Sequence, residues 1–352
     1  MKKSLLVILS MVMLLAASLD ITLAGGGKRN GTAGAQELLI PVGARGLALN
    51  GSYIPGFTGA EAIYYNPAGL IGATEKTEVL FSQMSYIADL DVSYAAVTAR
   101  MEELGAIGFS IKSLNFGEIP VTTVENPSGD GSTYKPTYVT IGLTYSNNLT
   151  DRIRVGATAK LVSEKIVRLS ATGMAFDAGV QYSNFADIEG FRLGMVVKNL
   201  GAQMTFDGPD LLRNAVEATS SRGTQFYQIV AAGFDLPSQL EIGLSYEGKL
   251  NNEFSGLVTT TYQDNNYLND EYKVGGELGF MDMFYARCGY SFIPQAKSDD
   301  EKLYGATYGI GVNIDAGIKI TVDYGYRTTR YFDANHIFTI KLGVSDKRLF
   351  AY

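Results

Sequence analysis

Segments of about nine to eleven residues in which apolar and polar residues alternate run through most of the chain, and this period of two is that of a β-strand with one apolar face. In residues 153–161, isoleucine, valine, alanine and leucine alternate with arginine, glycine, threonine and lysine. The same alternation recurs in segments 139–145, 176–181, 191–198, 306–312 and 318–324. The pattern predicts an all-β fold whose strands separate two different environments.

Charged residues within the strand-like segments indicate which environments these are, because all of them take the polar parity of their strand. The candidate lumenal charges are Arg154, Lys160, Asp177, Arg192, Glu277, Arg287, Lys319 and Asp323, and Lys198, Glu241, Lys273 and Lys341 follow the same rule. Near the bilayer centre a lysine or arginine that faces lipid costs about 2 to 4 kcal/mol, whereas one that faces a wet lumen costs little. We therefore expect the apolar residues to face lipid. A water-soluble sandwich with the two faces exchanged is the alternative.

The first 24 residues have the pattern of a secretory signal peptide. Lys2 and Lys3 precede an apolar run over 5–17, and Ala24 before Gly25 is a suitable cleavage site. After Ala24 no apolar stretch reaches the roughly 18 residues that a membrane helix needs. The exported chain is therefore expected to be soluble or to enter a membrane as a β-barrel.

The strand count favours a 14-stranded antiparallel transmembrane β-barrel over residues 76–344. Fifteen segments look strand-like, but single-chain bacterial barrels have an even number of strands with both ends in the periplasm. The count becomes even if 225–235 belongs to an excursion that does not span the membrane. Short connections then lie on one side, at 101–104, 148–152, 183–190, 249–253, 281–282 and 315–316. Long connections lie on the other, at 115–135, 200–238, 263–271, 293–304 and 327–335, as expected for outer loops.

Composition excludes several classes of function. A formal net charge of -7 without a basic run argues against nucleic acid as a partner. The single cysteine, Cys288, has no partner for a disulfide within the chain and falls on the lipid-facing parity. His336 is the only histidine, so the chain lacks the residues for a histidine-rich metal site and has a single candidate for the histidine of a catalytic triad. We expect no enzyme, catalytic residue, metal site or cofactor; a hydrolase using His336 near Asp333 is a weaker alternative.

The stretch "GAEAIYYNPAGLIG", residues 59–72, differs from the strands around it. Thr58 and Glu61 fit a capping box at the start of a short helix over 60–65. Pro67 then forces Asn66 out of helical geometry, so the helix ends sharply. The sequence predicts a short helical element before the first strand; a turn that merely caps the core is the plainer reading.

This region resembles the N-terminal segment of outer-membrane barrels of the PorV/PorQ group, which are relatives of the FadL long-chain fatty-acid transporters. The resemblance rests on Gly43-Ala44-Arg45-Gly46 and on Ala62-Ile63-Tyr64-Tyr65-Asn66-Pro67-Ala68-Gly69-Leu70. It implies a 14-stranded barrel in the cell outer membrane whose residues 25–75 fold inward as a hatch in the lumen. The implied hatch residues are Gly43, Ala44, Arg45, Tyr64, Tyr65, Asn66, Pro67 and Gly69. The tail at 345–352 departs from such barrels, which usually end on the last strand.

The resemblance also implies a function without covalent chemistry. Proteins of the PorV/PorQ group bind exported cargo proteins in type IX secretion, so the implied partners are outer-membrane lipids and exported proteins or other secretion components. The alternative is a FadL-like transporter of long-chain fatty acids or other hydrophobic small molecules. It needs a hydrophobic pocket that leads from the mouth to a kink or opening in the wall. A strand interrupted by glycine or proline beside the hatch would favour it, and "SLNFGEIPV" at 113–121 is the nearest candidate.

Two outer segments carry weaker predictions. Residues 209–220, "PDLLRNAVEATS", can form a short amphipathic helix that covers the mouth of the barrel, meets a partner, or only packs on its neighbours. The acidic run Asp299-Asp300-Glu301 can bind calcium, although a solvated charge run is the commoner case. Lumenal charges of both signs, such as Lys319 and Asp323 on one strand face, are expected to pair across the barrel rather than to select a solute.

Overall fold

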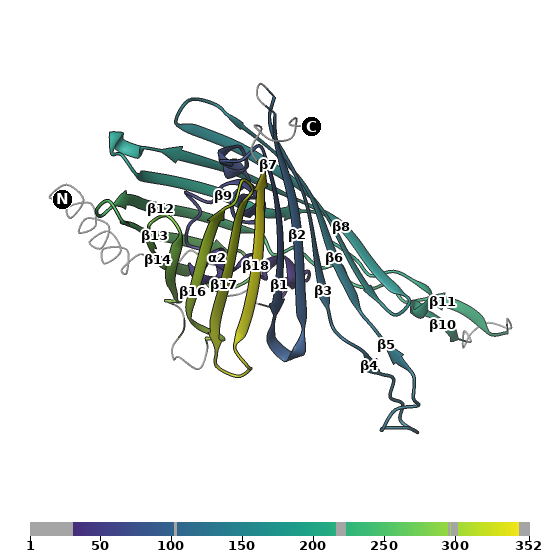
Figure 1. Ribbon diagram of the computed structural model, residues 1–352. Helices are drawn as coiled ribbons and strands as arrows, with labels where there is room; N and C mark the ends of the chain where they lie inside the picture. The colour runs from purple at the N-terminus through teal and green to yellow at the C-terminus, as the bar shows by residue number, and fades with distance from the viewer. Residues whose placement is uncertain (1–30, 102–103, 216–222, 295, 297–301, 345–352) are drawn as a thin grey trace, which may run out of the picture.

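The computed structural model describes residues 31–101, 104–215, 223–294, 296 and 302–344 (Figure 1). Within them, 14 strands form a closed antiparallel barrel in which β1 pairs with both β2 and β18. The barrel strands are β1 (Thr77–Ser85), β2 (Asp91–Met101), β3 (Gly105–Asn115), β6 (Thr137–Asn148), β7 (Ile153–Ile166), β8 (Leu169–Ser183), β9 (Phe191–Gly201), β12 (Gln239–Lys249), β13 (Phe254–Asn265), β14 (Glu271–Phe280), β15 (Phe284–Phe292), β16 (Tyr304–Asp315), β17 (Lys319–Thr329) and β18 (Asn335–Val344).

The two faces of the barrel wall are those that the alternation predicts. Large apolar side chains such as Phe81, Leu143 and Phe338 are exposed on the outside of the wall. Charged side chains such as Asp177 and Arg287 are buried on the inside. A transmembrane barrel has this inverted distribution, whereas a water-soluble sandwich buries its apolar face. The sandwich alternative is therefore wrong for this chain.

Connections at the two ends of the barrel differ in length, as the sequence predicts. The end that carries turns such as 149–152 and 281–283 is called the short-turn end, and the opposite one the long-loop end. Two hairpins project from the long-loop end: β4 (Ile119–Pro120) with β5 (Thr133–Tyr134), and β10 (Leu212–Ala215) with β11 (Gln225–Gln228) (Figure 1). One connection there, 167–168, is as short as a turn. The segment 225–235 contributes no barrel strand, which confirms the count.

Two predictions about the outer segments are wrong. The helix expected over 209–220 is limited to η7 (Pro209–Leu211), because Leu212–Ala215 instead pairs with β11; residues 216–220 lie outside the described part of the chain. The expected interruption at 113–121 does not fall in the wall. β3 pairs with β6 up to Asn115, and the residues that follow leave the barrel to form the β4–β5 hairpin.

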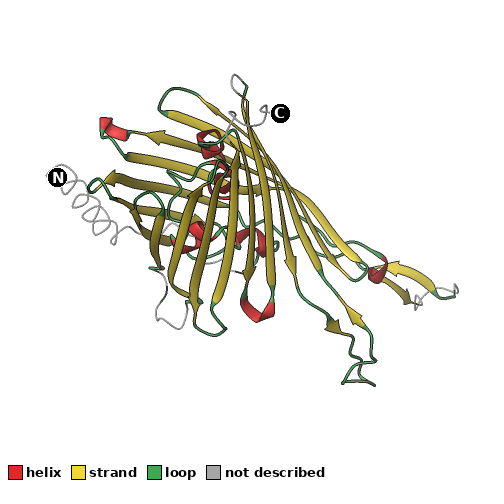
Figure 2. Cartoon of the chain, viewed as in Figure 1, coloured by secondary structure: helices red, strands yellow, loops and turns green. Residues whose placement is uncertain are grey.

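The N-terminal segment lies inside the barrel and crosses the lumen from end to end (Figures 1 and 2). At the long-loop end the Gly31 amide donates to the Tyr267 carbonyl, and Ala33 bridges to Asp235. The segment then forms η2 (Gln36–Leu39), α2 (Ala44–Ala48), η3 (Gly59–Glu61), α3 (Ala62–Tyr65) and η4 (Pro67–Gly72). It leaves the lumen at the short-turn end, where β1 begins. Residues 31–72 are called the hatch.

The short helix before the first strand forms largely as its residues predict. α3 ends at Tyr65, and Asn66 is extended at φ -155° before Pro67, which begins η4. The predicted capping box is wrong: Thr58 precedes η3 but makes no side-chain capping hydrogen bond. Glu61 instead turns toward basic residues of the hatch and wall, described below.

The predicted signal peptide at 1–24, the tail at 345–352 and the acidic run at 299–301 lie outside the described residues. No helix within the described ranges is long and apolar enough to cross a bilayer.

Candidate functional site: the hatch and the mouth cavity

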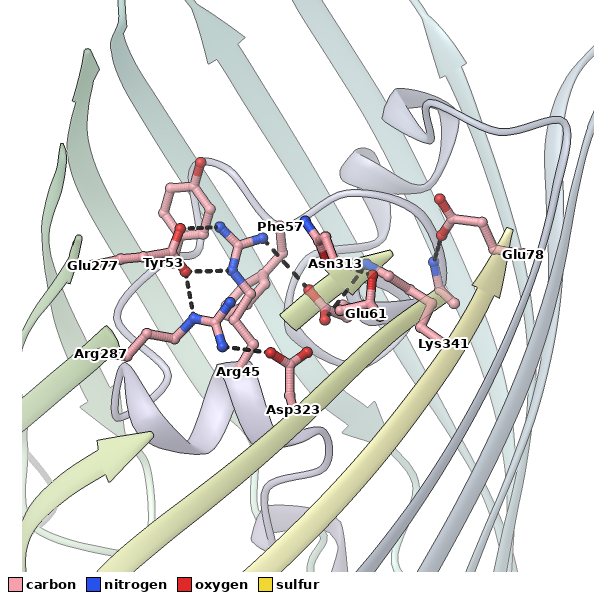
Figure 3. Close-up of polar contacts among 12 residues, drawn as sticks. Arg45, Tyr53, Phe57, Glu61, Glu78, Glu277, Arg287, Asn313, Asp323 and Lys341 are labelled. Atoms are coloured by element: carbon pink, nitrogen blue, oxygen red, sulfur yellow. Dashed lines mark hydrogen bonds and ion pairs between the residues drawn. The ribbon is translucent and has the colours of Figure 1, made fainter. Parts of the chain in front are cut away.

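Arg45 joins the hatch to the wall through a chain of buried charges (Figure 3). Gly43, at φ 77°, precedes α2 in a backbone conformation that suits glycine, and α2 presents Arg45 to β14. Arg45 Nε and Nη2 each donate to one carboxylate oxygen of Glu277 at 2.9 Å. Arg287 donates to Glu277 at 2.5 Å and to Asp323 at 2.5 Å. Two-pronged, charge-assisted bonds of this kind are among the strongest polar contacts in proteins.

Glu61 extends these contacts to the last strand. Its carboxylate lies 3.8 Å from Arg45 Nη1 and 3.7 Å from Lys341 Nζ. Nearby, the Ala60 amide donates to Glu78 Oε2 at 3.0 Å. Burial alone would lower the pKa of Arg45, but Glu277 and Glu61 hold that pKa well above its usual value. The hatch is thus tied by charge to β1, β14 and β18.

Asn66, between α3 and η4, fastens this part of the hatch by hydrogen bonds to backbone carbonyls. Its side-chain amide donates to the carbonyls of Ile54, Val180 and Met195 at 3.3, 3.1 and 3.4 Å. Its Oδ1 accepts the Ala68 amide at 3.2 Å and so caps η4. The side chain is fully buried, which a primary amide tolerates only when its hydrogen bonds are made.

Gly69 and Pro67 are closely packed against neighbouring backbone. A Cβ atom on Gly69 would lie 1.9 Å from the Phe57 carbonyl oxygen. Pro67 lies over Gly156 of β7, where a Cβ would come within 2.4 Å of the Pro67 carbonyl oxygen. Ala44, the first residue of α2, is held by its amide, which donates to Thr339 Oγ1 of β18 at 2.8 Å. The hatch motif therefore makes close backbone contacts both within the hatch and with the wall.

Tyr64 and Tyr65 point to different parts of the hatch. Tyr65 stacks on Phe57 with centroids 4.2 Å apart and donates to the Val42 carbonyl at 2.9 Å. Tyr64 donates to the Leu38 carbonyl at 3.2 Å. The Lys112 and Lys198 ammonium groups lie 4.9 and 5.1 Å from the Tyr64 ring centroid, within cation–π range. Burial raises the pKa of Tyr64 well above its usual value, so the ring stays neutral.

The candidate lumenal charges gather into separate groups. Lys160 pairs with Asp177 at 2.5 Å, and Lys198 pairs with Glu241 at 2.5 Å. Arg192 pairs with Glu247 at 3.1 Å and donates to the Tyr53 hydroxyl at 2.8 Å. Arg287 and Asp323 belong to the Arg45 network described above. Asp323 takes Arg287 of β15 as its partner, a pairing between strands, and Lys319 begins β17 beside the turn 316–318.

A cavity of about 420 Å³ lies between the hatch and the long-loop end and is called the mouth cavity. This volume is that of a small-molecule site. Apolar, aromatic, amide and charged side chains all contribute to its walls. They include Leu39, Ile40, Pro41, Leu47, Leu268, Ile293, Leu303, Tyr64, Tyr65, Tyr86, Tyr304, Gln36, Asn50, Gln239, Gln263, Asn269, Lys198, Lys273, Arg327, Glu241 and Glu271.

Two cations of the mouth cavity have neutral partners. Arg327 Nε and Nη2 donate to Asn335 Oδ1 at 3.0 and 2.8 Å, and the guanidinium carbon lies 3.6 Å from the Tyr304 ring centroid. Lys273 donates to Gln263 Oε1. Among the described residues neither forms an ion pair with a carboxylate, unlike Lys198. The alternation pattern places Lys273 inside the barrel but gives no signal that its charge is unbalanced, and it does not single out Arg327.

The remaining candidate residues lie away from the lumen or hold no metal. His336 is exposed on the outside of the wall and its Nδ1 lies 2.8 Å from the Tyr324 hydroxyl. Cys288 is exposed on the same face. Over the described ranges, no three or more His, Cys, Asp or Glu side chains are grouped to hold a metal ion.

Comparison with solved structures identifies the fold. The CymD monoaromatic hydrocarbon channel is similar at 12% identity and a TM-score of 0.55, over 87% of this chain and 98% of that one. The Ralstonia pickettii toluene transporter TbuX is similar at 14% identity and a TM-score of 0.53, over 86% and 98%. A Pseudomonas aeruginosa FadL homologue is similar at 12% identity and a TM-score of 0.50, over 87% and 99%.

These comparisons bear on the fold alone, because the identities are low. The chain has the 14-stranded architecture of FadL-like barrels. No family model and no curated protein sequence matches it. The narrower resemblance to the PorV/PorQ group gains no support from any of the comparisons.

Proposed function

We propose that this chain is an outer-membrane channel for hydrophobic small molecules and that it receives them in the mouth cavity. The observation that carries the proposal is a cavity of small-molecule size with apolar side chains in its wall and two cations that have no acidic partner among the described residues. The similar structures support it, since they are described as a monoaromatic hydrocarbon channel and a toluene transporter. Their barrel and the hatch-filled lumen here suit a route for single small molecules better than an open aqueous pore.

Different side chains of the mouth cavity are suited to the two parts of a permeant, its apolar body and its polar end. Leu39, Leu47 and Leu303 offer apolar surface to the body of a permeant. Arg327 and Lys273 lie in the same cavity and retain unused N–H donors, because a guanidinium carries five and only two are engaged here. A hydrophobic molecule with an acidic end is therefore bound better than the bare hydrocarbon of equal size.

Uptake by intact cells tests the proposal, because hydrophobic molecules cross a phospholipid bilayer unaided but an outer membrane slowly. The chain is expressed in a Gram-negative host that lacks its own transporter of this fold, and uptake of radiolabelled toluene and octanoate is measured. Both should exceed the vector control. The double variant Arg327→Gln, Lys273→Gln should lower octanoate uptake about tenfold and leave toluene uptake unchanged. Uptake of neither probe above the vector, with folded barrel present in the membrane, would overturn the proposal.

Binding of exported proteins is the second candidate, and one observation favours it. The β10–β11 hairpin projects from the long-loop end with Phe226 76% exposed, and Val230 just beyond it is 91% exposed (Figure 1). Exposed apolar side chains on a projecting hairpin are suited to a protein partner. The tagged barrel is extracted in mild detergent and its co-purified proteins are identified by mass spectrometry. Recovery of exported proteins with a shared C-terminal domain, lost when the hairpin is shortened, would establish this function instead.

A further inference from the structure

A second, much smaller cavity lies between the hatch and strands β2, β3, β6 and β7, and is called the inner cavity. Its volume is about 30 Å³, which is room for one or two atoms the size of a water oxygen. Its lining residues are Leu38, Ile63, Tyr64, Tyr94, Ser110, Lys112, Thr140, Gly142, Thr158 and Lys160. A space this small takes the polar end of a molecule and not its body.

Two hydroxyl groups that line the inner cavity are buried without a hydrogen-bond partner among the described residues. Thr140 is 8% exposed and Tyr94 is 4% exposed. Thr140 Oγ1 makes no hydrogen bond with any described residue. Tyr94 Oη lies beside the Ser110 hydroxyl but makes no hydrogen bond of normal geometry with it. Buried polar atoms are nearly always satisfied in proteins. These two are therefore placed to bind something that enters the cavity.

The cations of the inner cavity are already engaged. Lys112 Nζ donates to the Ile40 carbonyl at 2.5 Å, and Lys160 pairs with Asp177. The groups left open are the hydroxyls, each of which can donate and accept one hydrogen bond. Their natural complement is a neutral hydroxyl group, which also donates and accepts.

Tyr64 separates the inner cavity from the mouth cavity, because its side chain lines both. The ring is held by one hydrogen bond to the Leu38 carbonyl and by the two ammonium groups of Lys112 and Lys198. The mouth cavity offers space into which the ring can rotate. Such a rotation breaks one neutral hydrogen bond, gives up the two cation–π contacts and joins the two cavities.

We propose that the inner cavity is a binding site for the hydroxyl end of an aromatic permeant and that Tyr64 is the gate that admits it from the mouth cavity. The inference rests on the proposed function and adds a substrate class, hydroxylated aromatics, and two specificity residues, Thr140 and Tyr94. The ring of the permeant takes the place that Tyr64 leaves between Lys112 and Lys198, and its hydroxyl reaches Thr140 and Tyr94.

Two probes that differ by one hydroxyl test the site. Binding of radiolabelled toluene and 4-methylphenol to the purified, folded barrel is measured by equilibrium dialysis. The wild type should bind 4-methylphenol about three- to tenfold more tightly than toluene, the range expected for a hydroxyl that satisfies buried partners. Thr140→Val and Tyr94→Phe should bring this ratio close to one and leave toluene binding unchanged. A ratio that neither variant alters would show that the inner cavity holds only water, and would overturn the proposal.

Uptake of the same probes by cells tests the gate. Tyr64→Ala should raise the uptake rate of 4-methylphenol several-fold, whereas the matched control Tyr64→Phe, which keeps the ring, should raise it far less. Equal rates for wild type and Tyr64→Ala, with the barrel folded as judged by its heat-dependent mobility on a gel, would refute the gate. Failure of the proposed function looks different, because the wild type would then bind and transport neither toluene nor 4-methylphenol.

Discussion

The hatch contacts the barrel wall in two different ways on two sides of the lumen. Toward β14, β15, β17 and β18 the contacts are ionic: Arg45, Glu61 and Lys341 join a chain of charges that ends at Asp323 (Figure 3). Toward β2, β3, β6 and β7 no ion pair between hatch and wall is found among the described residues: the contacts there include hydrogen bonds to hatch carbonyls, from Ser146 to Ala68 and from Lys112 to Ile40, and a cavity lies beside them. We call these the charged side and the neutral side.

The difference indicates which part of the hatch can yield. Separating a buried ion pair leaves uncompensated charge and is strongly unfavourable, whereas a neutral hydrogen bond contributes about 1 kcal/mol net. The charged side is therefore the fixed anchor, and movement of single side chains such as Tyr64 is far easier on the neutral side. A permeant is then expected to pass along the neutral side while the hatch remains attached to the charged side.

Breaking the anchor gives the largest expected effect. Arg45→Met leaves Glu277 with Arg287 as its remaining partner and removes the contact to Glu61. Loss of one member of a buried pair destabilises by about 3 to 5 kcal/mol, so the hatch should leave the lumen in a measurable fraction of molecules. Planar-bilayer recordings should then show ionic conductance that the wild type lacks.

The control for the anchor is another arginine that pairs at a more exposed position. Arg192 pairs with Glu247, and the two side chains are 29% and 43% exposed. Solvent-exposed pairs contribute about 0 to 1 kcal/mol, so Arg192→Met should produce little conductance. Equal conductance from both variants would mean that the charged side is not a special anchor.

Acidity should control the outer part of the hatch. Burial, with the neighbouring Glu164 carboxylate adding to it, raises the pKa of Glu37 from 4.5 to about 7. Glu164 on β7, Lys112 on β3 and Tyr138 on β6 face this carboxyl. A raised pKa means that docking is most stable below pH 4.5 and is lost as pH rises through about 7.

Hydrogen exchange measures this docking. Protection of residues 36–41, corrected for intrinsic exchange, should fall close to tenfold per pH unit between about pH 5 and 6.5 and level off above about pH 7. Glu37→Gln keeps a neutral side chain and should remove the pH dependence. Protection that changes equally in wild type and Glu37→Gln would assign the effect to another group.

A smaller effect is expected from a single contact on the neutral side. Ser146 on β6 donates to the Ala68 carbonyl of the hatch at 2.8 Å. Ser146→Ala removes one neutral hydrogen bond, so protection of residues 66–70 against hydrogen exchange should fall by a factor equivalent to about 1 kcal/mol. Ser93→Ala is the matched control, since Ser93 bonds Gln83 within the wall and should leave the hatch unchanged. If Ser146→Ala lowered the protection of residues 66–70 as much as Arg45→Met does, the two sides would not differ in how firmly they hold the hatch.

The barrel could be predicted from the sequence because lipid imposes a simple rule on every strand. A charge such as Asp177 or Arg287 must face inward, and the period of two then fixes the faces of the whole strand. A separate rule, that single-chain barrels have an even number of strands, excluded 225–235, and its residues 225–228 pair with Leu212–Ala215 outside the barrel. Loop segments follow no such rule, so a helix was expected where β10 forms.

The site was predictable only in part, because its contacts join residues far apart in the chain. The hatch motif indicated where the plug lies, but Glu61 was expected to cap a helix and instead contacts Arg45 and Lys341. Strand parity placed Lys273 in the lumen without revealing that its partner is the neutral Gln263. The inner cavity depends on how Tyr64 packs against four strands, and alternation along one strand carries no information about that.

The smallest effect is expected from a change at His336. This change tests whether a reaction takes place on the outer face of the wall rather than in the lumen. The ring lies on the outer face of the wall, bonded to the Tyr324 hydroxyl and 5.3 Å from the Tyr326 ring centroid. His336→Phe keeps an aromatic ring at the lipid surface, where surface substitutions usually change stability by less than about 0.5 kcal/mol. Uptake of toluene and octanoate should match the wild type, because passage depends on the mouth cavity and the neutral side. Ester hydrolysis by the purified wild type that disappears in His336→Phe would instead establish the hydrolase alternative, with His336 as its catalytic residue.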